Sequence, residues 1–397
     1  MSDSLDELKQ SVCDAIDAMR DTLLHVSHEI HANPELSFEE RKACDLLVST
    51  LRESGLDVTP EAYGLPTAFS SDFGEAKESG RVALLAEYDA LPEIGHACGH
   101  NLIATASIGA GLALKTLGDR LPGAVRILGT PAEERGGGKE LMARQGAFEG
   151  IDAAMMIHPA GVNLVDMPSI AVGEVEVTYT GVAAHASAMP ERGRNALDGL
   201  VFAYQAIGAL RQHIRPSERI HGIITNGGQA PNIVPERAVG RFYVRARNEK
   251  DLEPLKERVS GCFRAGAEAT GTEVALEWSP VDYLAIRFNE PLASRFQENA
   301  ERLGREFVPL DKLPSRFAGS TDMGNVSHRV PSIHPMLAAA PPHCTIHNAE
   351  FALHAGAEIG DAAAIDGAKA LAMTALDYLA DADLRDRTRN IFEAFSE

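Results

Sequence analysis

Hydrophobic positions in the first 160 residues alternate between helical and strand-like patterns. Apolar residues at helical spacing predict helices, which cover about 5–31, 38–54, 101–118 and 139–148. Short runs rich in apolar and β-branched residues predict buried strands between them, at 81–90, 124–130 and 153–160. Strands that alternate with helices in this way predict an α/β fold with a mostly parallel sheet flanked by helices.

The pattern changes near residue 170. The segment SIAVGEVEVTYTG alternates apolar and polar residues, as in a half-exposed antiparallel strand. The elements that follow predict the order β-α-β-β-α-β, which is typical of a small α+β domain with a four-stranded antiparallel sheet and two helices. We therefore expect residues 171–285 to be inserted, as a second domain, into an α/β domain formed by 1–170 and 286–397. A length of 397 residues also favours two domains.

Composition and charge limit the partners of the chain. The formal net charge of −20 argues against nucleic acid, which requires a concentrated basic surface, and against anionic membranes. The N-terminal segment lacks the apolar core of a secretory signal, and no apolar stretch is long enough to span a bilayer. The five cysteines are odd in number and widely spread, so we expect no disulfide framework and a cytoplasmic location.

Side chains of the types that bind metals follow the predicted strands, where parallel α/β sheets place their sites. In HACGHN, Cys98 and His100 are two residues apart, so an extended segment would direct both to one side of the loop. A thiolate and an imidazole together suit a borderline ion such as Zn²⁺, although Mn²⁺ or Co²⁺ also occupies mixed sites. This segment alone is equally consistent with a small core cysteine and two polar loop histidines.

Three further segments add candidate ligands. The adjacent Glu133 and Glu134 repel each other when buried, and a cation resolves this if one carboxylate ligates and the other accepts a proton from water. The residues alone do not assign the two roles, and a solvated turn explains the pair more simply. His158 and His347 could complete the set, although each alone is equally typical of a structural or surface histidine. Together these donors suit a pair of divalent ions, which can lower the pKa of water toward ~7 and polarise a carbonyl for amide hydrolysis.

The order and content of several motifs carry a resemblance to a known family. The chain resembles the M20 metallopeptidases, in particular the amidohydrolase branch with aminoacylase-like, dipeptidase and aminobenzoyl-glutamate hydrolase-like enzymes. The matching segments are HEIHANPELSFEE (28–40), EYDALPEIGHACGHN (87–101), GTPAEERGGGK (129–139), MMIHPA (155–160), TGVAAHASAMPERGRNAL (180–197), QAPNIVPERA (229–238) and GSTDMGNVS (319–327).

The resemblance implies a role for each candidate in the first domain. The metal ligands that it implies, with the cysteine as a bridging or shared ligand, are Cys98, His100, Glu134, His158 and His347. Glu133 is implied to be the general base, and Asp89 of EYDALP to be the acid that orients a metal-site imidazole or thiolate. The implied cofactors are two divalent ions, Mn²⁺ or Zn²⁺, with Co²⁺ as a further alternative.

The inserted domain is implied to be a lid and dimerisation module, so the resemblance implies a homodimer. In that module His185 resembles the residue that reaches a neighbouring active site and stabilises the oxyanion, and Asn232 resembles a substrate-orienting side chain. Arg245 is a candidate clamp for a substrate carboxylate, because arginine suits bidentate pairing, or alternatively a solvated charge on a strand.

The GSTDMGN segment is a departure from the wider pattern of the branch, as is Asn101 after the CGH motif. Both variants resemble the subgroup that contains dipeptidases and aminobenzoyl-glutamate hydrolases. Within the Gly319 loop, Ser320 and Thr321 are similar to backbone or hydroxyl donors that bind a substrate carboxylate.

The hypothesis from the sequence is hydrolysis of the amide bond of an N-acyl amino acid or dipeptide, with Glu133 moving the proton of the attacking water. Three alternatives remain. They are a peptidase for longer peptides, a non-catalytic metal-binding relative, and a thiol hydrolase in which Cys98 is the nucleophile and His100 its base.

Overall fold

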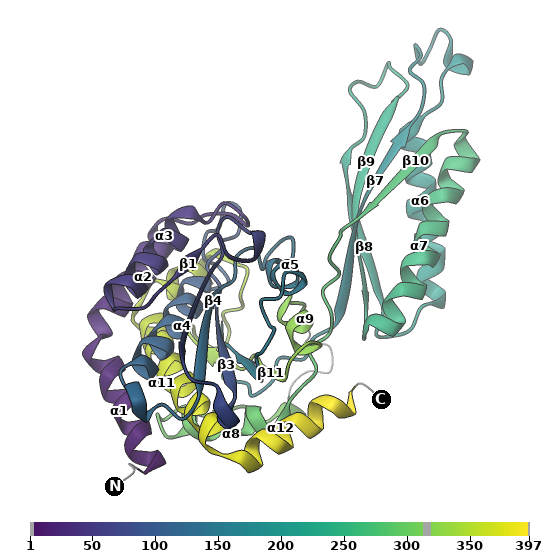
Figure 1. Cartoon of the computed structure of the whole chain (residues 1–397). Coiled ribbons are helices and arrows are strands. Elements are labelled where there is room, and N and C mark those ends of the chain that lie inside the picture. The colour runs from purple at the N-terminus through teal and green to yellow at the C-terminus, as the bar shows by residue number, and fades with distance from the viewer. Residues whose placement is uncertain (1–3, 313–318, 396–397) are drawn as a thin grey trace. The chain divides into compact units, whose positions relative to one another are not determined.

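The computed structural model describes residues 4–312 and 319–395. The chain divides into two compact units, Met1–Pro168 with Ile286–Glu397, and Ser169–Ala285 (Figure 1). Within the described ranges no helix combines the length and apolar character needed to cross a membrane.

The first unit is built on a six-stranded sheet of order β1-β2-β4-β3-β5-β11. Its strands are β1 (Thr59–Pro60), β2 (Phe69–Gly74), β3 (Arg81–Ala86), β4 (Ala124–Gly129), β5 (Ala153–Met155) and β11 (Ser332–Ile333). The pairs β3–β4, β3–β5 and β5–β11 are parallel, whereas β2 pairs antiparallel with β4 and β1. A separate two-stranded parallel sheet joins β6 (His158–Ala160) to β12 (Met336–Ala338).

Helices pack on both faces of the six-stranded sheet. The helices of this unit are α1 (Leu5–Ala18), α2 (Arg20–Ala32), α3 (Arg41–Glu53), α4 (His100–Lys115), α5 (Gly138–Arg144), α8 (Glu290–Glu301), α9 (Met323–Ser327), α10 (Ala349–Ala355), α11 (Glu358–Ala380) and α12 (Ala382–Ala394). Side chains of β3 alternate between the faces: Val82 and Leu84 join the core with α4 and α11, whereas Ala83 and Leu85 join the core with α5 and α9. Burial on both faces explains the continuous apolar pattern of this strand.

The second unit is an antiparallel sheet with two helices. Its strand order is β10-β7-β9-β8, and its elements in chain order are β7 (Ala171–Thr180), α6 (Ala196–Leu210), β8 (Arg219–Asn226), β9 (Arg237–Ala246), α7 (Glu249–Thr270) and β10 (Glu273–Trp278). Figure 1 shows α6 and α7 side by side along this sheet. The predicted fold class, a mostly parallel α/β sheet together with a four-stranded antiparallel α+β sheet, is therefore confirmed.

Several predicted element boundaries were wrong. The helix predicted over 5–31 is interrupted at Met19, which separates α1 from α2. The strand predicted over 153–160 is two strands in different sheets, because β5 pairs with β11 and β6 pairs with β12. The strand β2 was not predicted, since its polar FSSDFG sequence lacks the apolar run of its neighbours.

A buried ion-pair network connects the end of β3 to α5 and α9. The ammonium of Lys139, near the start of α5, pairs with Glu87 just after β3 and donates to Asp322 Oδ1 at 2.6 Å. The backbone N–H of Lys139 also donates to Asp322 Oδ2 at 2.9 Å, and all three side chains are fully buried. Burial lowers the pKa of Lys139, but Asp322 and Glu87 outweigh it and raise that pKa, so the ammonium stays charged.

We predict that Lys139→Met lowers the free energy of unfolding by about 3–5 kcal/mol, because it leaves two buried carboxylates without their cation. Urea denaturation measures this loss. The matched control is Arg387→Met, which breaks the exposed pair with Asp383 and is expected to cost less than about 1 kcal/mol. Equal losses in the two variants would show that the buried network does not stabilise the fold.

Candidate metal centre

The candidate ligands of the first unit gather where its strands end. Asp89 follows β3, Glu133 and Glu134 follow β4, and His158 begins β6. The carboxyl ends of parallel strands meet at one edge of a sheet, so segments far apart in the sequence converge there.

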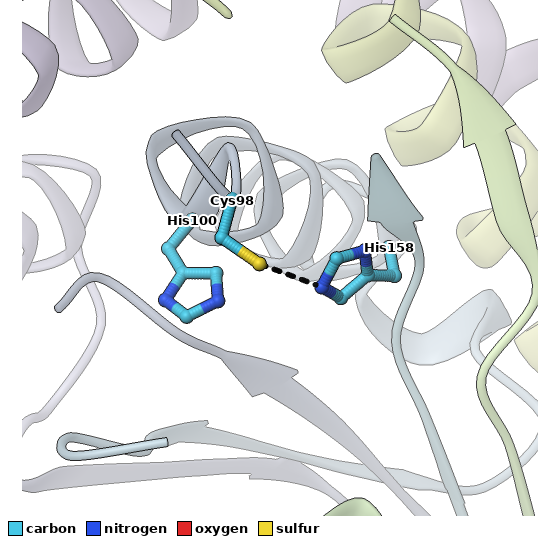
Figure 2. A group of neighbouring side chains, drawn as sticks. All are labelled: Cys98, His100 and His158. Atoms are coloured by element: carbon cyan, nitrogen blue, oxygen red, sulfur yellow. Dashed lines mark hydrogen bonds between the residues drawn. The ribbon is translucent and has the colours of Figure 1, made fainter. Parts of the chain in front are cut away.

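Cys98 lies between two imidazoles. Its Sγ is 3.3 Å from Nε2 of His158 and 3.4 Å from Nε2 of His347. Figure 2 shows Cys98 and His100 projecting from the start of α4 toward the same space as His158. The ligand atoms of these three residues lie within 4.8 Å of one another.

The expected extended conformation of the Cys98–His100 segment is wrong. Gly99 is left-handed, with φ of 78°, and His100 is already the first residue of α4. A Cβ at position 99 would lie 2.9 Å from the Cβ of Pro159, so both the backbone angle and the close contact favour glycine. A tight turn, not strand alternation, therefore directs the thiol and the imidazole to one side.

The two adjacent carboxylates approach the same imidazole. Nε2 of His100 is 3.8 Å from Oε1 of Glu134 and 3.9 Å from Oε2 of Glu133. Glu134 Oε1 is also 3.7 Å from Nε2 of His347. Cys98, Glu134 and His347 form a second group of ligand atoms within 4.8 Å, and His100, Glu133 and Glu134 form a third. The groups share members, so the structure brings all five predicted ligands and Glu133 into one cluster.

Two buried atoms of this cluster test whether the donors fit a metal. Within the described part of the chain, His100 Nε2 and Glu134 Oε1 have no hydrogen-bond partner. A buried polar atom without a partner costs about 1–3 kcal/mol, and a bound cation would remove that cost. Sulfur, nitrogen and oxygen donors at this spacing suit Zn²⁺, Mn²⁺ or Co²⁺. The residues therefore fit a divalent-metal centre.

Asp89 fixes the orientation of the His100 ring. Its Oδ1 is 3.0 Å from His100 Nδ1, and its Oδ2 accepts the Ser37 hydroxyl at 2.8 Å and the Glu134 N–H at 2.9 Å. Burial raises the pKa of Asp89, but the bonds from His100, Glu134 and Ser37 outweigh it and lower that pKa to about 2. A permanently charged carboxylate at Nδ1 favours a proton there, which directs the Nε2 lone pair into the cluster.

Burial also shapes the charge of the glutamate pair. Burial raises the pKa of Glu133, and the negative charges of Glu87 and Glu134 raise it further. Burial raises the pKa of Glu134 as well, opposed by the neighbouring His100 and His347. Both directions describe the metal-free protein, in which the pair resists holding two negative charges.

Sequence reasoning missed a set of buried residues around the cluster. Glu87 Oε2 is 3.5 Å from His100 Nε2, and the ring of His334 lies 5.1 Å from that of His158. The ion-pair network of Glu87, Lys139 and Asp322 therefore borders the cluster. One signal was available: Glu87 and Asp89 are two acidic residues directly after a buried strand, which are costly there without compensating charge.

In the second unit His185 and Asn232 are neighbours. The N–H of Ala186 donates to Asn232 O at 3.0 Å, and both predicted side chains belong to residues that are at least partly exposed. His185 Nδ1 accepts the N–H groups of Ser187 and Ala188 at 3.4 and 3.3 Å. These two donors place the ring proton of neutral His185 on Nε2, where it can be donated to a ligand.

Arg245 lies at the other end of the same sheet. It pairs with Val172 at the start of β7, whereas the segment that contains His185 follows the end of β7, where Thr180 pairs with Arg237. Eight residues along a strand span about 26 Å, so the unit does not bring Arg245 to His185. Nε of Arg245 donates to His221 Nε2 at 3.3 Å, and its guanidinium carbon lies 5.5 Å from the centre of the Tyr243 ring.

The Gly319 loop is held by its backbone. The N–H of Gly319 donates to Pro168 O at 3.1 Å, and Oγ1 of the buried Thr321 accepts the N–H of Met323 at 3.2 Å. Ser320 lies between them and is partly exposed. Asp322, which binds Lys139, anchors this loop beside the metal cluster.

Comparisons with known proteins agree with this geometry. Residues 83–377 match the family model Peptidase family M20/M25/M40. The chain is 40% identical over 402 residues to the Xaa-Arg dipeptidase of Mus musculus, covering 98% of this chain and 93% of that protein. It is 28% identical over 455 residues to a p-aminobenzoyl-glutamate hydrolase from Escherichia coli (strain K12), covering 96% and 94%.

Solved structures show the same fold. The aminobenzoyl-glutamate utilization protein of Klebsiella pneumoniae aligns with a TM-score of 0.73 at 19% identity, covering 92% of this chain and 97% of that one. The YXEP protein of Bacillus subtilis, described as a dinuclear metal binding peptidase, aligns with a TM-score of 0.65 at 21% identity, covering 92% and 99%. The resemblance inferred from the motifs is confirmed: this chain belongs to the peptidase family M20/M25/M40.

Proposed function

We propose that this protein hydrolyses the amide bond of a dipeptide or an N-acyl amino acid, using two divalent ions held by Cys98, His100, Glu134, His158 and His347. The observation that carries the proposal is the cluster of these donors with two buried atoms that have no hydrogen-bond partner within residues 4–312 and 319–395. The relatives are consistent with it, since they include a dipeptidase and an aminobenzoyl-glutamate hydrolase.

Cys98 is the proposed shared ligand, because it belongs to one ligand group with His158 and to another with His347. Bound Mn²⁺, Zn²⁺ or Co²⁺ would lower the pKa of a coordinated water toward ~7 and polarise the scissile carbonyl. Asp89 would hold the His100 ring in place, as it does in the metal-free protein.

Glu133 is the proposed general base. It is adjacent to the ligand Glu134, its Oε2 lies 3.9 Å from His100 Nε2, and it is buried from bulk water. From this place it can accept the proton of the attacking water and deliver it to the leaving amine. A thiol mechanism fits less well, because the sulfur of Cys98 faces two imidazoles of the ligand cluster.

We propose Glu133→Gln as the first test of this role. The variant keeps the size of the side chain but cannot accept the proton, so kcat should fall by at least about 10²–10⁴-fold while metal content is unchanged. Activity of the metal-stripped protein should return when Mn²⁺, Zn²⁺ or Co²⁺ is restored. The control is Glu393→Gln at an exposed position. Activity that survives metal removal, or that persists in Glu133→Gln, would contradict the mechanism.

A homodimer in which His185 serves the site of the partner subunit is the second part of the proposal. The outer strand β8 exposes apolar side chains, with Ile223 63% and Ile224 40% exposed, and an unpaired edge of this kind favours association. The donor Nε2–H of His185 and the neighbouring Asn232 would stabilise the oxyanion and orient the substrate.

Mixing two inactive variants tests the shared site. His185→Ala and Glu133→Gln dimers should each be inactive. After subunit exchange, half of the dimers are mixed, and each mixed dimer has one intact site made from both chains. About a quarter of wild-type activity should therefore return, measured on the mixture after refolding or prolonged incubation. No recovery despite confirmed exchange would show that His185 acts within its own subunit or not at all.

The substrate class is proposed as a dipeptide with a basic C-terminal residue. The relatives from Mus musculus and Homo sapiens that are 40% and 38% identical to this chain are both named Xaa-Arg dipeptidase. A net charge of −20 also favours the approach of cationic substrates. Ser320, Thr321 and the Gly319 backbone are proposed to bind the substrate carboxylate. Arg245 is a weaker candidate for this because it already contacts His221.

Dipeptides that differ only in the C-terminal residue test this substrate class. We expect kcat/KM for Ala-Arg to exceed that for Ala-Ala by at least about tenfold, since one specific pocket contact is worth about 1–3 kcal/mol. N-acetylarginine and a tetrapeptide ending in arginine distinguish dipeptides from acyl amino acids and from longer peptides. Equal or higher kcat/KM for Ala-Ala would contradict the basic preference. The proposed location is cytoplasmic, because all five cysteines are free.

A further inference from the structure

A second group of metal-binding side chains lies outside the cluster described above. Cys344, Glu350 and His354 offer a sulfur, a carboxylate oxygen and a ring nitrogen, all within 4.8 Å of one another. Glu350 and His354 are four residues apart on α10, so both lie on one face of that helix. We propose that these three residues form a third divalent-metal site, which binds Zn²⁺.

The loop before α10 is folded so that the cysteine faces the helix. Asn348 is the N-cap of α10, and its Oδ1 accepts the N–H of Phe351 at 2.8 Å. The amide of the same side chain donates to Thr345 O at 2.6 Å, which holds the loop against the first helical turn. The buried Cys344 is thereby held beside the helix face that carries the other two donors.

The donor set suits zinc better than manganese or magnesium. Zn²⁺ accepts thiolate, imidazole and carboxylate together, with bonds of about 2.0–2.3 Å that imply donor separations of roughly 3.3–3.7 Å. The group is therefore slightly open, and the exposed Glu350 can move to close it. His343 adds a fourth donor, because its Nε2 lies 3.4 Å from Glu350 Oε1.

Zinc at this site would constrain the segment that carries His347. That residue lies between Cys344 and Glu350 in the chain, its backbone is left-handed with φ of 67°, and its N–H donates to Ala97 O at 2.8 Å. The third site shares no ligand with the catalytic cluster, yet an ion bound there would stiffen the loop that supplies one of its ligands.

An alternative explanation needs no ion. Cys344 packs with Phe351 and Ala355 in a small apolar core, and His343 and Glu350 would be an ordinary exposed ion pair. The two explanations differ in the number of zinc ions that the protein binds and in which side chains that number depends on.

Zinc content after equilibration and desalting tests the site, measured by atomic emission on the metal-stripped full chain reloaded with Zn²⁺. Cys344→Ser and His354→Gln should each bind one ion fewer per chain than the wild type. Cys262→Ser is the matched control, because this cysteine lies on α7 and should leave the zinc content unchanged. The same zinc content in wild type, Cys344→Ser and His354→Gln would overturn the proposal.

Hydrogen exchange gives a readout that does not depend on activity. Excess Zn²⁺ added to protein already loaded with Mn²⁺ should slow exchange in residues 343–355 of the wild type and leave Cys344→Ser unchanged. Slowing of the same size in Cys344→Ser would assign the effect to another ion site and overturn the proposal. Circular dichroism of each variant confirms that it is folded before these comparisons are made.

Discussion

Buried negative charge is the constraint on which the centre of this protein depends. Glu87, Asp89, Glu133 and Asp322 are buried, and the side chain of Glu134 is only 10% exposed. Carboxylates cannot share a low-dielectric site unless positive charge compensates them. Lys139 compensates two of them through direct ion pairs, and the remaining charge creates a strong preference for divalent cations.

The same constraint explains why the ligands come from the ends of several strands. Each central strand of the parallel sheet is apolar and buried on both faces, so polar side chains are accommodated only where the strand ends. Asp89 follows β3 and the glutamate pair follows β4, while a left-handed Gly99 turns Cys98 and His100 toward them at the start of α4. The fold concentrates charge at one edge, and the centre forms there.

Much of this was predictable from local sequence patterns, but contacts between distant segments were not. Alternation of apolar runs with helical spacing predicted the two sheets, and strand-end histidines and acids predicted the ligand cluster. Periodicity carries no information about the turn at Gly99 or about the break at Met19 that separates α1 from α2. The role of Lys139 was also hidden, because its partners Glu87 and Asp322 lie far away in the sequence and only the folded chain brings them together. The separation of Arg245 from His185 depends on strand register, which no single motif reveals.

The most direct test of the central claim is anomalous X-ray diffraction from crystals of the Mn²⁺-loaded protein. The account predicts two anomalous peaks about 3.5–4 Å apart, with Cys98 between them and with His100, Glu134, His158 and His347 as the surrounding ligands. A fully loaded crystal with no peak among these side chains, or with peaks bound by other residues, would contradict it.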